Sequence, residues 1–348
     1  LIFRSLDKSN RAHINVCHFT SVHKWDDIRI FLKECSSLAD AGFNVSLVAK
    51  GVTDQEVNGV KVFGVPDLGG SRLKRATQQG KLVYQKALSL NADIYHFHDP
   101  ELLRYGKKLA RKGKKVVYDS HEDFPGQLRG KHWIPSILRG TVSGIANNYE
   151  KKAVRSFAGV VAATPTIRKI FEAHHKNVAE VNNFPILSEF QEGIQEKEPN
   201  TLCYVGAITR LRGIVPLIKA MEDIDATLHI AGKFGESDLE HELNQMPGWK
   251  KVVFHGILGR KEVIALLHRC QIGTVTLKYN ENYALSQPIK MYEYMLAEQA
   301  VVATEFPLWK ELIDHGKFGA CVDPEDPGAI AAAINRLLKD PAMIAEMG

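Results

Sequence analysis

The sequence predicts an α/β protein made of two doubly wound parallel-sheet domains, and three observations lead to this prediction. Short runs rich in β-branched residues alternate with amphipathic helical patterns almost throughout, which is typical of βαβ units. The chain has 348 residues, which is longer than most domains with a single hydrophobic core. Residues 182–200 hold two prolines, a glycine and an acidic cluster, and they interrupt the alternation as a domain boundary does.

The first domain is predicted over residues 1–184. Its Val- and Ile-rich runs are typical of parallel strands that helices cover on both faces. Gly42 ends the first helix, as glycine commonly does. In order, we predict strands at 14–19, 45–50, 60–65, 93–98, 115–120 and 159–164, with helices at about 27–41, 72–90 and 103–112 and a long one that ends near residue 156.

A linker is predicted over 185–200 and the second domain over 201–348. Ser286 or Gln287 is a suitable N-cap for one of its helices, and Pro288 suits the first turn. In order, we predict strands at 202–207, 227–232, 252–257, 272–277, 300–304 and 319–323, with helices from Ile214, at 260–270, 286–296 and around 309–313, and a final helix. Ligands of such sheets bind beyond the carboxyl ends of the strands.

Composition excludes several classes of protein. No run approaches the roughly 20 apolar residues of a membrane span, and the first residues lack the layout of a signal peptide. The five cysteines form no C-x-x-C pair, so neither a disulfide framework nor a cysteine zinc site is predicted. We therefore expect a cytoplasmic protein.

Charge is distributed unevenly along the chain. Residues 1–185 carry 29 Lys and Arg against 17 Asp and Glu, whereas the remainder is acidic. The segment 126–140 interleaves Arg129, Lys131 and Arg139 with Trp133 and with Ile134, Ile137 and Leu138. This mixture suits an anionic membrane surface or a lipid-linked acceptor, although a solvated face is an equal alternative. No signature of nucleic-acid binding is present.

The helix at 286–296 places two charges, Lys290 and Glu293, among apolar residues. Lys290 lies near the amino end, where the helix dipole disfavours a cation, so it needs an anion nearby. An internal Lys290–Glu293 pair is one interpretation. The other is a nucleotide diphosphate, with phosphate held at the helix start and Glu293 accepting hydrogen bonds from the ribose. The residues alone leave both open.

A second basic site follows the strand at 202–207. Arg210, Arg212 and Gly213 occupy the loop that leads into the next helix. Guanidinium groups and backbone donors there suit phosphate oxygens. Two such sites on neighbouring strand ends are able to clamp one pyrophosphate.

An ordered set of motifs runs through both halves of the chain. In the second half these are "LCYVGAITRLRGI", "LHIAG", "VVFHGILGRKEVIALL", "SQPIKMYEYMLAEQAVVAT" and "FPLWKELI". In the first half they are "HFTSVHKWDDIRIFLKECSSLADAGFNVSLV", "DIYHFHDPELL" and "KVVYDSHED". The two sets resemble the donor and acceptor domains of the retaining GT-B glycosyltransferases of carbohydrate-active family 4, also called glycosyl transferases group 1. The resemblance covers nearly the whole chain and implies two Rossmann-like domains that face each other across a cleft.

The resemblance also implies roles for residues at matching positions. Glu293 matches the glutamate that binds the nucleotide ribose, and Arg212 matches the basic residue of the diphosphate clamp, which Lys290 supports. His121 matches the histidine that faces the transferred sugar and the acceptor. Further candidates are Gly206 and Lys233 on the donor side and His23, Asp99 and Glu101 on the acceptor side, where Asp99 and Glu101 are expected to border the cleft.

The sequence departs from the family pattern at two donor positions. Leu285 stands where members often carry a glutamate, so Ser286, Gln287 and backbone amides are expected to contact the sugar hydroxyls. Ala207 stands where the first basic residue of the clamp usually lies, and we expect Arg210 to replace it.

The expected activity is transfer of a sugar from a UDP- or GDP-sugar to a saccharide or lipid-linked acceptor, in the synthesis of polysaccharide or glycoconjugate. Arg210, Arg212 and Lys290 would stabilise the departing diphosphate without a metal or other cofactor. The resemblance implies retention of configuration, with His121 orienting groups. We expect the work to be done in the cytoplasm, with possible attachment to the inner membrane face.

Two alternatives remain open from the residues. His96 and His98 lie on one face of a predicted strand, and with His121 they could serve a metal-dependent hydrolase. The other alternative is a protein that binds nucleotide sugars without turnover.

Overall fold

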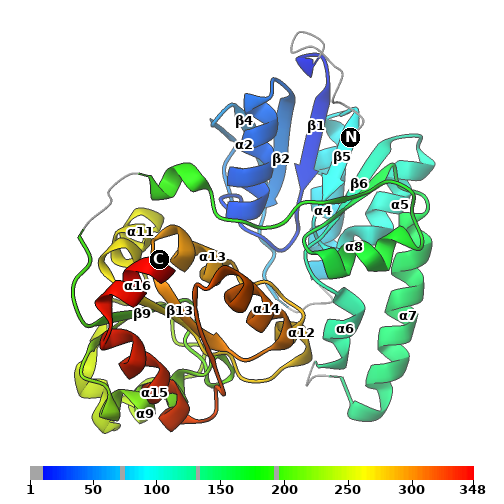
Figure 1. The fold of residues 1–348 in the computed structure, drawn as a ribbon. Helices are drawn as coiled ribbons and strands as arrows, with labels where there is room; N and C mark the ends of the chain where they lie inside the picture. Colours follow the sequence, from blue (N-terminus) through cyan, green and yellow to red (C-terminus); the bar gives the residue numbers. More distant parts are fainter. Residues whose placement is uncertain (1–10, 71–74, 131–133, 192–195) are drawn as a thin grey trace. The chain divides into compact units, whose positions relative to one another are not determined.

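The computed structural model describes residues 11–70, 75–130, 134–191 and 196–348 of the chain (Figure 1). The chain divides after Asn183 into two compact units. Each unit is a parallel sheet with helices on its faces, as the alternating pattern predicts.

The first unit contains an eight-stranded sheet in the order β3-β4-β2-β1-β5-β6-β7-β8. All neighbours pair in parallel except β3 and β4, which are antiparallel. The short edge strands β3 and β8 were not predicted. The strands are β1 (Asn15–Phe19), β2 (Asn44–Lys50), β3 (Gln55–Val57), β4 (Val60–Val65), β5 (Ile94–Phe97), β6 (Lys115–Ser120), β7 (Gly159–Ala162) and β8 (Val178–Glu180).

Helices cover both faces of this sheet, and two apolar cores lie between sheet and helices. Alternate residues of β1 face the two cores, since Cys17 and Phe19 join one and Val16 joins the other. The helical segments are η1 (Ile28–Cys35), α2 (Ser36–Asp40), η2 (Arg75–Gln79), α4 (Gly80–Ser89), η3 (Pro100–Leu102), α5 (Leu103–Arg111), α6 (Phe124–Arg129), α7 (Ser136–Val154) and α8 (Pro165–Glu172).

The first helix differs in type from the prediction. Its first part, η1, is a π-helix, and only α2 is α-helical. The Asp27 side chain caps η1 by accepting from the backbone N–H groups of Arg29 and Ile30, at 2.9 and 3.0 Å. Wide turns of this kind are rare and often lie at functional sites.

The second unit contains a fully parallel six-stranded sheet in the order β11-β10-β9-β12-β13-β14. Residues of β9 again alternate between two cores, with Leu202 and Tyr204 in one and Cys203 and Val205 in the other. The strands are β9 (Thr201–Val205), β10 (Thr227–Ala231), β11 (Val252–Phe254), β12 (Ile272–Val275), β13 (Ala300–Thr304) and β14 (Gly319–Val322).

The helical segments of the second unit lie between these strands. They are η4 (Leu187–Phe190), η5 (Arg210–Arg212), α9 (Ile214–Ala220), η6 (Met221–Asp223), α10 (Leu239–Asn244), η7 (Pro247–Lys251), α11 (Arg260–Arg269), α12 (Glu281–Ala284), α13 (Ile289–Leu296), α14 (Pro307–Gly316), α15 (Pro327–Leu338) and α16 (Pro341–Met347). Among the residues that the structure describes, none of the helices has both the length and the apolar composition required to cross a bilayer.

The start of the segment predicted to be a linker belongs to the second unit. η4 lies within it, and Phe190 is 3% exposed and packs in a core of that unit. Glu189 of the same turn pairs with Arg260 of α11 at 2.7 Å.

Candidate active site

The carboxyl ends of β1, β5 and β6 carry the acceptor-side candidates of the first unit. Asp99 follows β5 and is buried, and its carboxylate ties the loop after β1 to the end of β5. It accepts hydrogen bonds from Thr20 Oγ1 at 2.9 Å, from Ser21 N at 2.5 Å and from Val22 N at 3.2 Å. Glu101 lies beside these hydrogen bonds, and its Oε1 atom is 3.3 Å from Ser21 Oγ.

His23 lies in the same loop and contacts two carboxylates. Its Nδ1 atom is 3.2 Å from Asp27 Oδ2, and its Nε2 atom is 3.6 Å from Asp99 Oδ1. The hydrogen bond with Asp27 raises the pKa of His23, although burial acts against it. The His23 and His121 rings are 5.5 Å apart. The structure thus brings His23, Asp99, Glu101 and His121 to one edge of the sheet.

His121 is held by a buried charge network that sequence reasoning missed. Its Nε2 atom is 3.0 Å from Asp119 Oδ2, and Arg29 of η1 binds the same carboxylate through Nε at 3.1 Å and Nη2 at 2.9 Å. Burial acts to raise the pKa of Asp119, but His121, His98 and Arg29 hold it well below its ordinary value. The alternation of β6, which points Asp119 and His121 the same way, was the available signal.

In the second unit, Arg212 and Lys290 converge on the end of β9. A Cβ atom added at Gly206 would lie 3.0 Å from Arg212 Nη1 and 3.1 Å from Lys290 Cε, so a side chain there would displace both. Arg212 and Lys290 also line one pocket of about 310 Å³ with Ser286. This places two cations and the amino end of α13 together, as the sequence predicts for a diphosphate site.

Lys290 lies in the first turn of α13 with its side chain 27% exposed. Burial lowers the pKa of Lys290, with Arg260 and Arg212 adding to this effect and Glu293 opposing it. A nearby anion such as a phosphate would favour the charged form of this partly buried amine.

Arg210 does not join this pocket, contrary to the expectation that it replaces the first basic residue of the clamp. Its guanidinium binds three carboxylates on the other side of the loop: Glu236, Asp238 at 2.9 Å, and Glu242. Its backbone N–H also donates to Glu236 at 2.9 Å. These contacts explain why the side chain points away from Arg212.

The start of α13 also differs from the prediction. Pro288 is its N-cap, and neither Ser286 nor Gln287 caps the helix with its side chain. The Ser286 hydroxyl instead donates to the Tyr283 carbonyl at 2.9 Å. Ser286 still lines the pocket, and Gln287 is half-buried.

Glu293 is buried in α13 and pairs with two cations. Arg260 Nη1 donates to Glu293 Oε1 at 2.5 Å, and Lys290 Nζ lies 3.5 Å from Oε2. The Lys290–Glu293 contact thus exists, and Arg260 is the stronger partner that the sequence did not reveal. A carboxylate has further lone pairs, so Glu293 keeps acceptor capacity beyond these two contacts.

Lys233 lies in the loop after β10 and is exposed. Its carbonyl accepts a hydrogen bond of 2.9 Å from Ile208 N, which places this loop beside the loop after β9. The donor-side candidates therefore gather at the carboxyl ends of β9, β10 and β12.

Two family models match most of the chain. Glycosyltransferase Family 4 matches residues 29–182, and Glycosyl transferases group 1 matches residues 187–348. The boundary between the matches lies close to the boundary between the two units.

Known proteins resemble the chain over most of its length. Phosphatidyl-myo-inositol mannosyltransferase of Mycolicibacterium smegmatis is 22% identical over 325 residues, which cover 87% of this chain and 78% of that protein. Sucrose-phosphate synthase from Thermosynechococcus elongatus has a TM-score of 0.73 at 15% identity, covering 96% of this chain and 92% of that one. Anabaena HepE, solved with UDP and glucose, has a TM-score of 0.69 at 17% identity, with coverages of 96% and 92%.

Each of the two units is matched by its own glycosyltransferase family model, and the solved structures share the fold of the chain. The chain belongs to the family 4, group 1 glycosyltransferases, and it is a transferase with the GT-B fold.

Proposed function

We propose that the protein is a retaining glycosyltransferase that moves a sugar from a UDP- or GDP-sugar to a saccharide or lipid-linked acceptor, in the synthesis of polysaccharide or glycoconjugate. The observation that carries the proposal is the convergence of Arg212 and Lys290 on Gly206 beside the amino end of α13. Two cations and a helix start at one strand end suit a diphosphate.

Charge development explains why these groups would promote transfer. When the bond between the anomeric carbon and the phosphate oxygen breaks, the diphosphate leaves with the electron pair and gains negative charge. Arg212, Lys290 and the amino end of α13 would stabilise that charge. The chain's own cations supply this stabilisation, so the proposed donor chemistry requires no metal.

The ribose and the acceptor have separate candidate partners. Glu293 would accept hydrogen bonds from the ribose hydroxyls while Arg260 fixes its orientation. At the acceptor, a hydroxyl oxygen attacks the anomeric carbon on the face that the diphosphate leaves, and its proton passes to the leaving phosphate oxygen. His121 would orient these groups, because Asp119 holds its Nε2 atom.

The relatives support particular donors and acceptors. HepE has been solved with UDP and glucose, which favours a UDP-sugar here. The mycobacterial relative is named as a mannosyltransferase of phosphatidyl-myo-inositol, which favours an acceptor with a lipid anchor.

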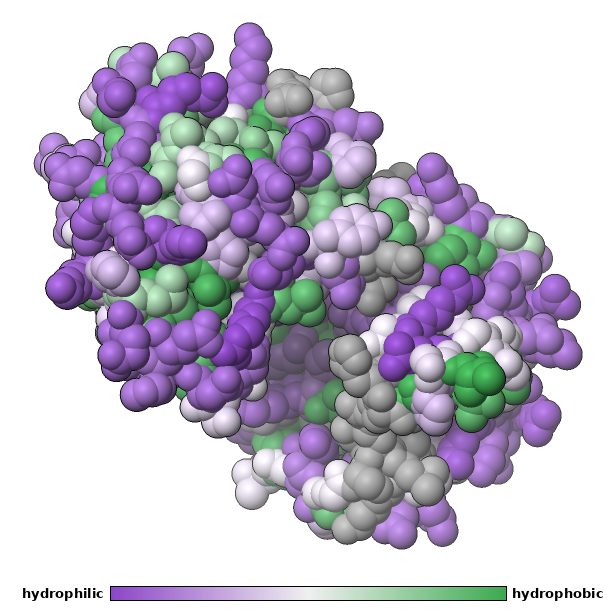
Figure 2. Space-filling model, turned by 90° about the horizontal axis from the view of Figure 1, so that it is seen from below, coloured by the Kyte–Doolittle hydropathy of each residue, from purple (hydrophilic) through white to green (hydrophobic). Residues whose placement is uncertain are grey.

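Association with an anionic membrane is the least supported part of the proposal, and it rests on α7. Ile137, Leu138 and Ile145 are 87%, 49% and 65% exposed, next to a strongly basic amino half. Seen from below, apolar residues form small patches on a largely hydrophilic surface (Figure 2). Ile134, which the sequence placed in the same surface, is 4% exposed, and Lys131 and Trp133 lie outside the described residues.

Membrane association is tested by flotation with anionic and neutral vesicles. The chain is expected to bind the anionic vesicles, and Ile137→Glu combined with Ile145→Glu is expected to abolish binding. Ile257→Glu, at a residue that is 75% exposed in the second unit, is the matched control. Equal partitioning onto both kinds of vesicle would contradict this part of the proposal.

Donor binding is tested by calorimetric titration of EDTA-treated protein with UDP, GDP and CMP. Saturable binding of one diphosphate is expected, with binding weakened in Glu293→Ala and unchanged in Glu311→Ala, an exposed residue of α14. A requirement for added divalent ions, or equal binding by both variants, would contradict the assignment of the donor site.

The burial of His96 and His98 argues against the hydrolase alternative. A catalytic metal needs an open position for water and substrate. The His98 and Asp119 side chains are both 0% exposed, so a substrate has no access to them. The assignment of both units to transferase families also argues against a protein that only binds nucleotide sugars.

A further inference from the structure

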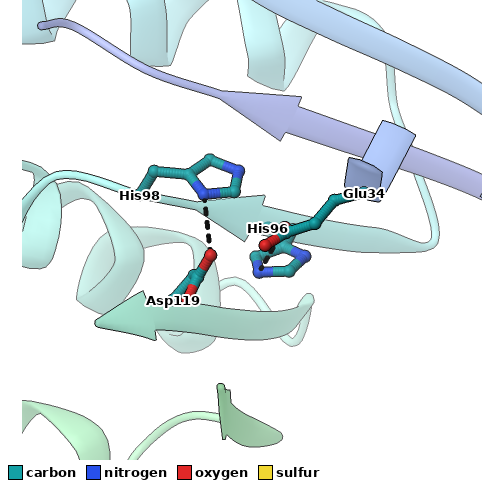
Figure 3. Close-up of side chains that lie close together, drawn as sticks. All are labelled: Glu34, His96, His98 and Asp119. Carbon is teal, nitrogen blue, oxygen red and sulfur yellow. Dashed lines mark hydrogen bonds and ion pairs between the residues drawn. The ribbon is translucent and has the colours of Figure 1, made fainter. Parts of the chain in front are cut away.

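A group of imidazole and carboxylate side chains, most of them buried, lies close together in the first unit (Figure 3). Glu34 comes from η1, His96 from β5, His98 directly follows β5, and Asp119 comes from β6. One nitrogen or oxygen of each lies within 4.8 Å of the others. His96 and His98 are two residues apart in extended chain, so both point to the same side of the sheet.

Several polar atoms of this group lack hydrogen bonds. Both carboxylate oxygens of Glu34, His96 Nε2 and His18 Nε2 are buried and accept or donate none within the described residues. Buried polar groups are nearly always bonded, and each one left unpaired costs about 1–3 kcal/mol. Two of these atoms, His96 Nε2 and Glu34 Oε2, lie 3.9 Å apart and face a group that would complete them both.

The charges of the group are also unbalanced. Two carboxylates, Glu34 and Asp119, face one guanidinium: Arg29 binds both oxygens of Asp119, and its Nε atom lies 3.2 Å from Glu34 Oε1. One buried negative charge therefore needs a proton or a cation.

We propose that Glu34, His96, His98 and Asp119 bind one divalent transition-metal ion. Two imidazoles with two carboxylates suit Zn²⁺ or a neighbouring first-row ion, whereas Mg²⁺ and Ca²⁺ prefer oxygen ligands alone.

The distances are close to those of a zinc site. Bonds of about 2.0–2.1 Å in a tetrahedron place neighbouring ligand atoms about 3.3 Å apart. His98 Nδ1 and Asp119 Oδ2 are 3.2 Å apart, and His96 Nε2 and Glu34 Oε2 are 3.9 Å apart. All four ligand atoms lie within 4.8 Å of one another, so the widest separations have to shorten by at most about 1.5 Å to reach that spacing.

Hydrogen-bond partners for the ligands of such an ion are present in the structure. His98 Nε2 lies 3.0 Å from His18 Nδ1, so the nitrogen that does not face the ion has a hydrogen-bond partner. Arg29 fixes the orientation of Asp119 from the other side. Contacts of this kind orient metal ligands and fix their tautomers. The ion would hold Asp119, the partner of His121, in a fixed position. Donor binding by the second unit would not depend on the ion.

A single proton on Glu34 is the competing explanation. Burial and the nearby Asp119 raise the pKa of Glu34 well above its ordinary value, which a shared proton would also satisfy. The two explanations differ for Glu34→Gln. This variant mimics the protonated acid and keeps its shape, but it removes a charged metal ligand.

The experiment uses the full chain without an affinity tag. Metal content is measured by mass spectrometry as purified, and EDTA-treated protein is titrated with Co²⁺, with visible absorption and thermal unfolding as readouts, followed by displacement with Zn²⁺. We expect one ion per chain, ligand-field bands and a raised Tm. Glu34→Gln and His96→Asn are each expected to weaken Co²⁺ binding at least tenfold.

His229→Asn is the matched control, because His229 is a buried histidine of the second unit that pairs with His255 at 3.0 Å. It is expected to bind Co²⁺ as the unchanged chain does, and circular dichroism identifies any variant that does not fold. The proposal is overturned if the unchanged chain takes up no ion, or if Glu34→Gln binds Co²⁺ equally well. A metal-free chain that Glu34→Gln stabilises would instead establish the proton.

Discussion

Arg260 Nη1 donates a hydrogen bond of 2.5 Å to Glu293 Oε1, and the same guanidinium binds Glu189 at 2.7 Å. Glu293 is 3% exposed, so Arg260 compensates a carboxylate that water barely reaches. This pair connects α11 with α13, and through Glu189 it fixes η4 to the same unit. Arg260, which does not line the pocket, therefore holds in place Glu293, the proposed partner of the ribose.

Arg260→Ala is expected to lower both stability and donor affinity. Hydrogen bonds to charged groups contribute about 1.5–3 kcal/mol, and we expect a loss of stability in that range, measured by urea unfolding. UDP affinity is expected to fall at least fivefold, because Glu293 loses its fixed orientation. Arg269 lies on the same helix as Arg260 and forms a more exposed pair with Glu198. Arg269→Ala should therefore change stability and UDP affinity only slightly.

A double-mutant cycle tests whether Arg260 acts through Glu293. In a Glu293→Gln background, Arg260→Ala should cost clearly less affinity for UDP than it does in the unchanged chain. Equal costs in both backgrounds would show that Arg260 acts independently of Glu293.

Arg212→Ala and Arg210→Ala are expected to behave differently, although the residues are two positions apart. Arg212 lines the pocket, so its loss should weaken UDP binding at least tenfold, which corresponds to about 1.4 kcal/mol. Arg210 is bound to carboxylates outside the pocket, so UDP affinity should stay within about twofold. Calorimetric titration of both variants with UDP measures the two losses of affinity. A larger loss in Arg210→Ala would support the sequence-based expectation that Arg210 belongs to the diphosphate clamp.

Much of the fold could be predicted because its signals are local. The strands at 115–120 and 300–304 were predicted with their observed bounds, since buried parallel strands are short apolar runs with clear ends. The edge strands β3 and β8 were missed because their three residues include polar or charged ones, whereas β11, of the same length, is an apolar run. Sequence distance also matters: Glu293 and its partner Arg260 are 33 positions apart, and no periodicity connects them.

The π-helix explains why Glu34 escaped notice. Residues five positions apart, such as Arg29 and Glu34, lie on different sides of an α-helix that turns about 100° per residue. In the wider turns of η1 they lie on one side, and Arg29 Nε is 3.2 Å from Glu34 Oε1. A sequence pattern that assumes the α-helical period therefore separates two residues that share a cluster.

Gly213→Ala is expected to destabilise the protein strongly. Gly213 has φ +73°, and an added Cβ would lie 1.7 Å from the Thr276 carbonyl oxygen, which is backbone and cannot turn aside. The left-handed conformation and the overlap together should cost about 2–5 kcal/mol in urea unfolding.

Gly140→Ala is the matched control for this substitution. Gly140 lies in α7, is exposed, and has open space around the added Cβ. Alanine there should stabilise the chain by about 0.5–1 kcal/mol, because it favours helix. Similar effects at both positions would contradict the close approach of the loop after β9 to Thr276.

Glu150 of α7 makes stability depend on pH. It is 3% exposed and accepts a hydrogen bond of 2.9 Å from the Tyr118 hydroxyl. Burial raises the pKa of Glu150 to about 7, although the bond from Tyr118 opposes the rise. Between pH 4.5 and 7 the folded chain therefore binds more protons at this site than the unfolded chain. Because of this difference, the group's contribution to stability falls as pH rises through that window.

Glu150→Gln is expected to remove this part of the pH dependence. Glutamine keeps an acceptor for Tyr118 and carries no charge, so the variant should be more stable than the unchanged chain at pH 8, by at most about 3 kcal/mol. At pH 4.5 the two should unfold at similar urea concentrations. Glu122→Gln, at an exposed residue, should leave the pH profile unchanged. A variant that is less stable at pH 8 would show that the ionised carboxylate, despite its burial, stabilises the fold through Tyr118.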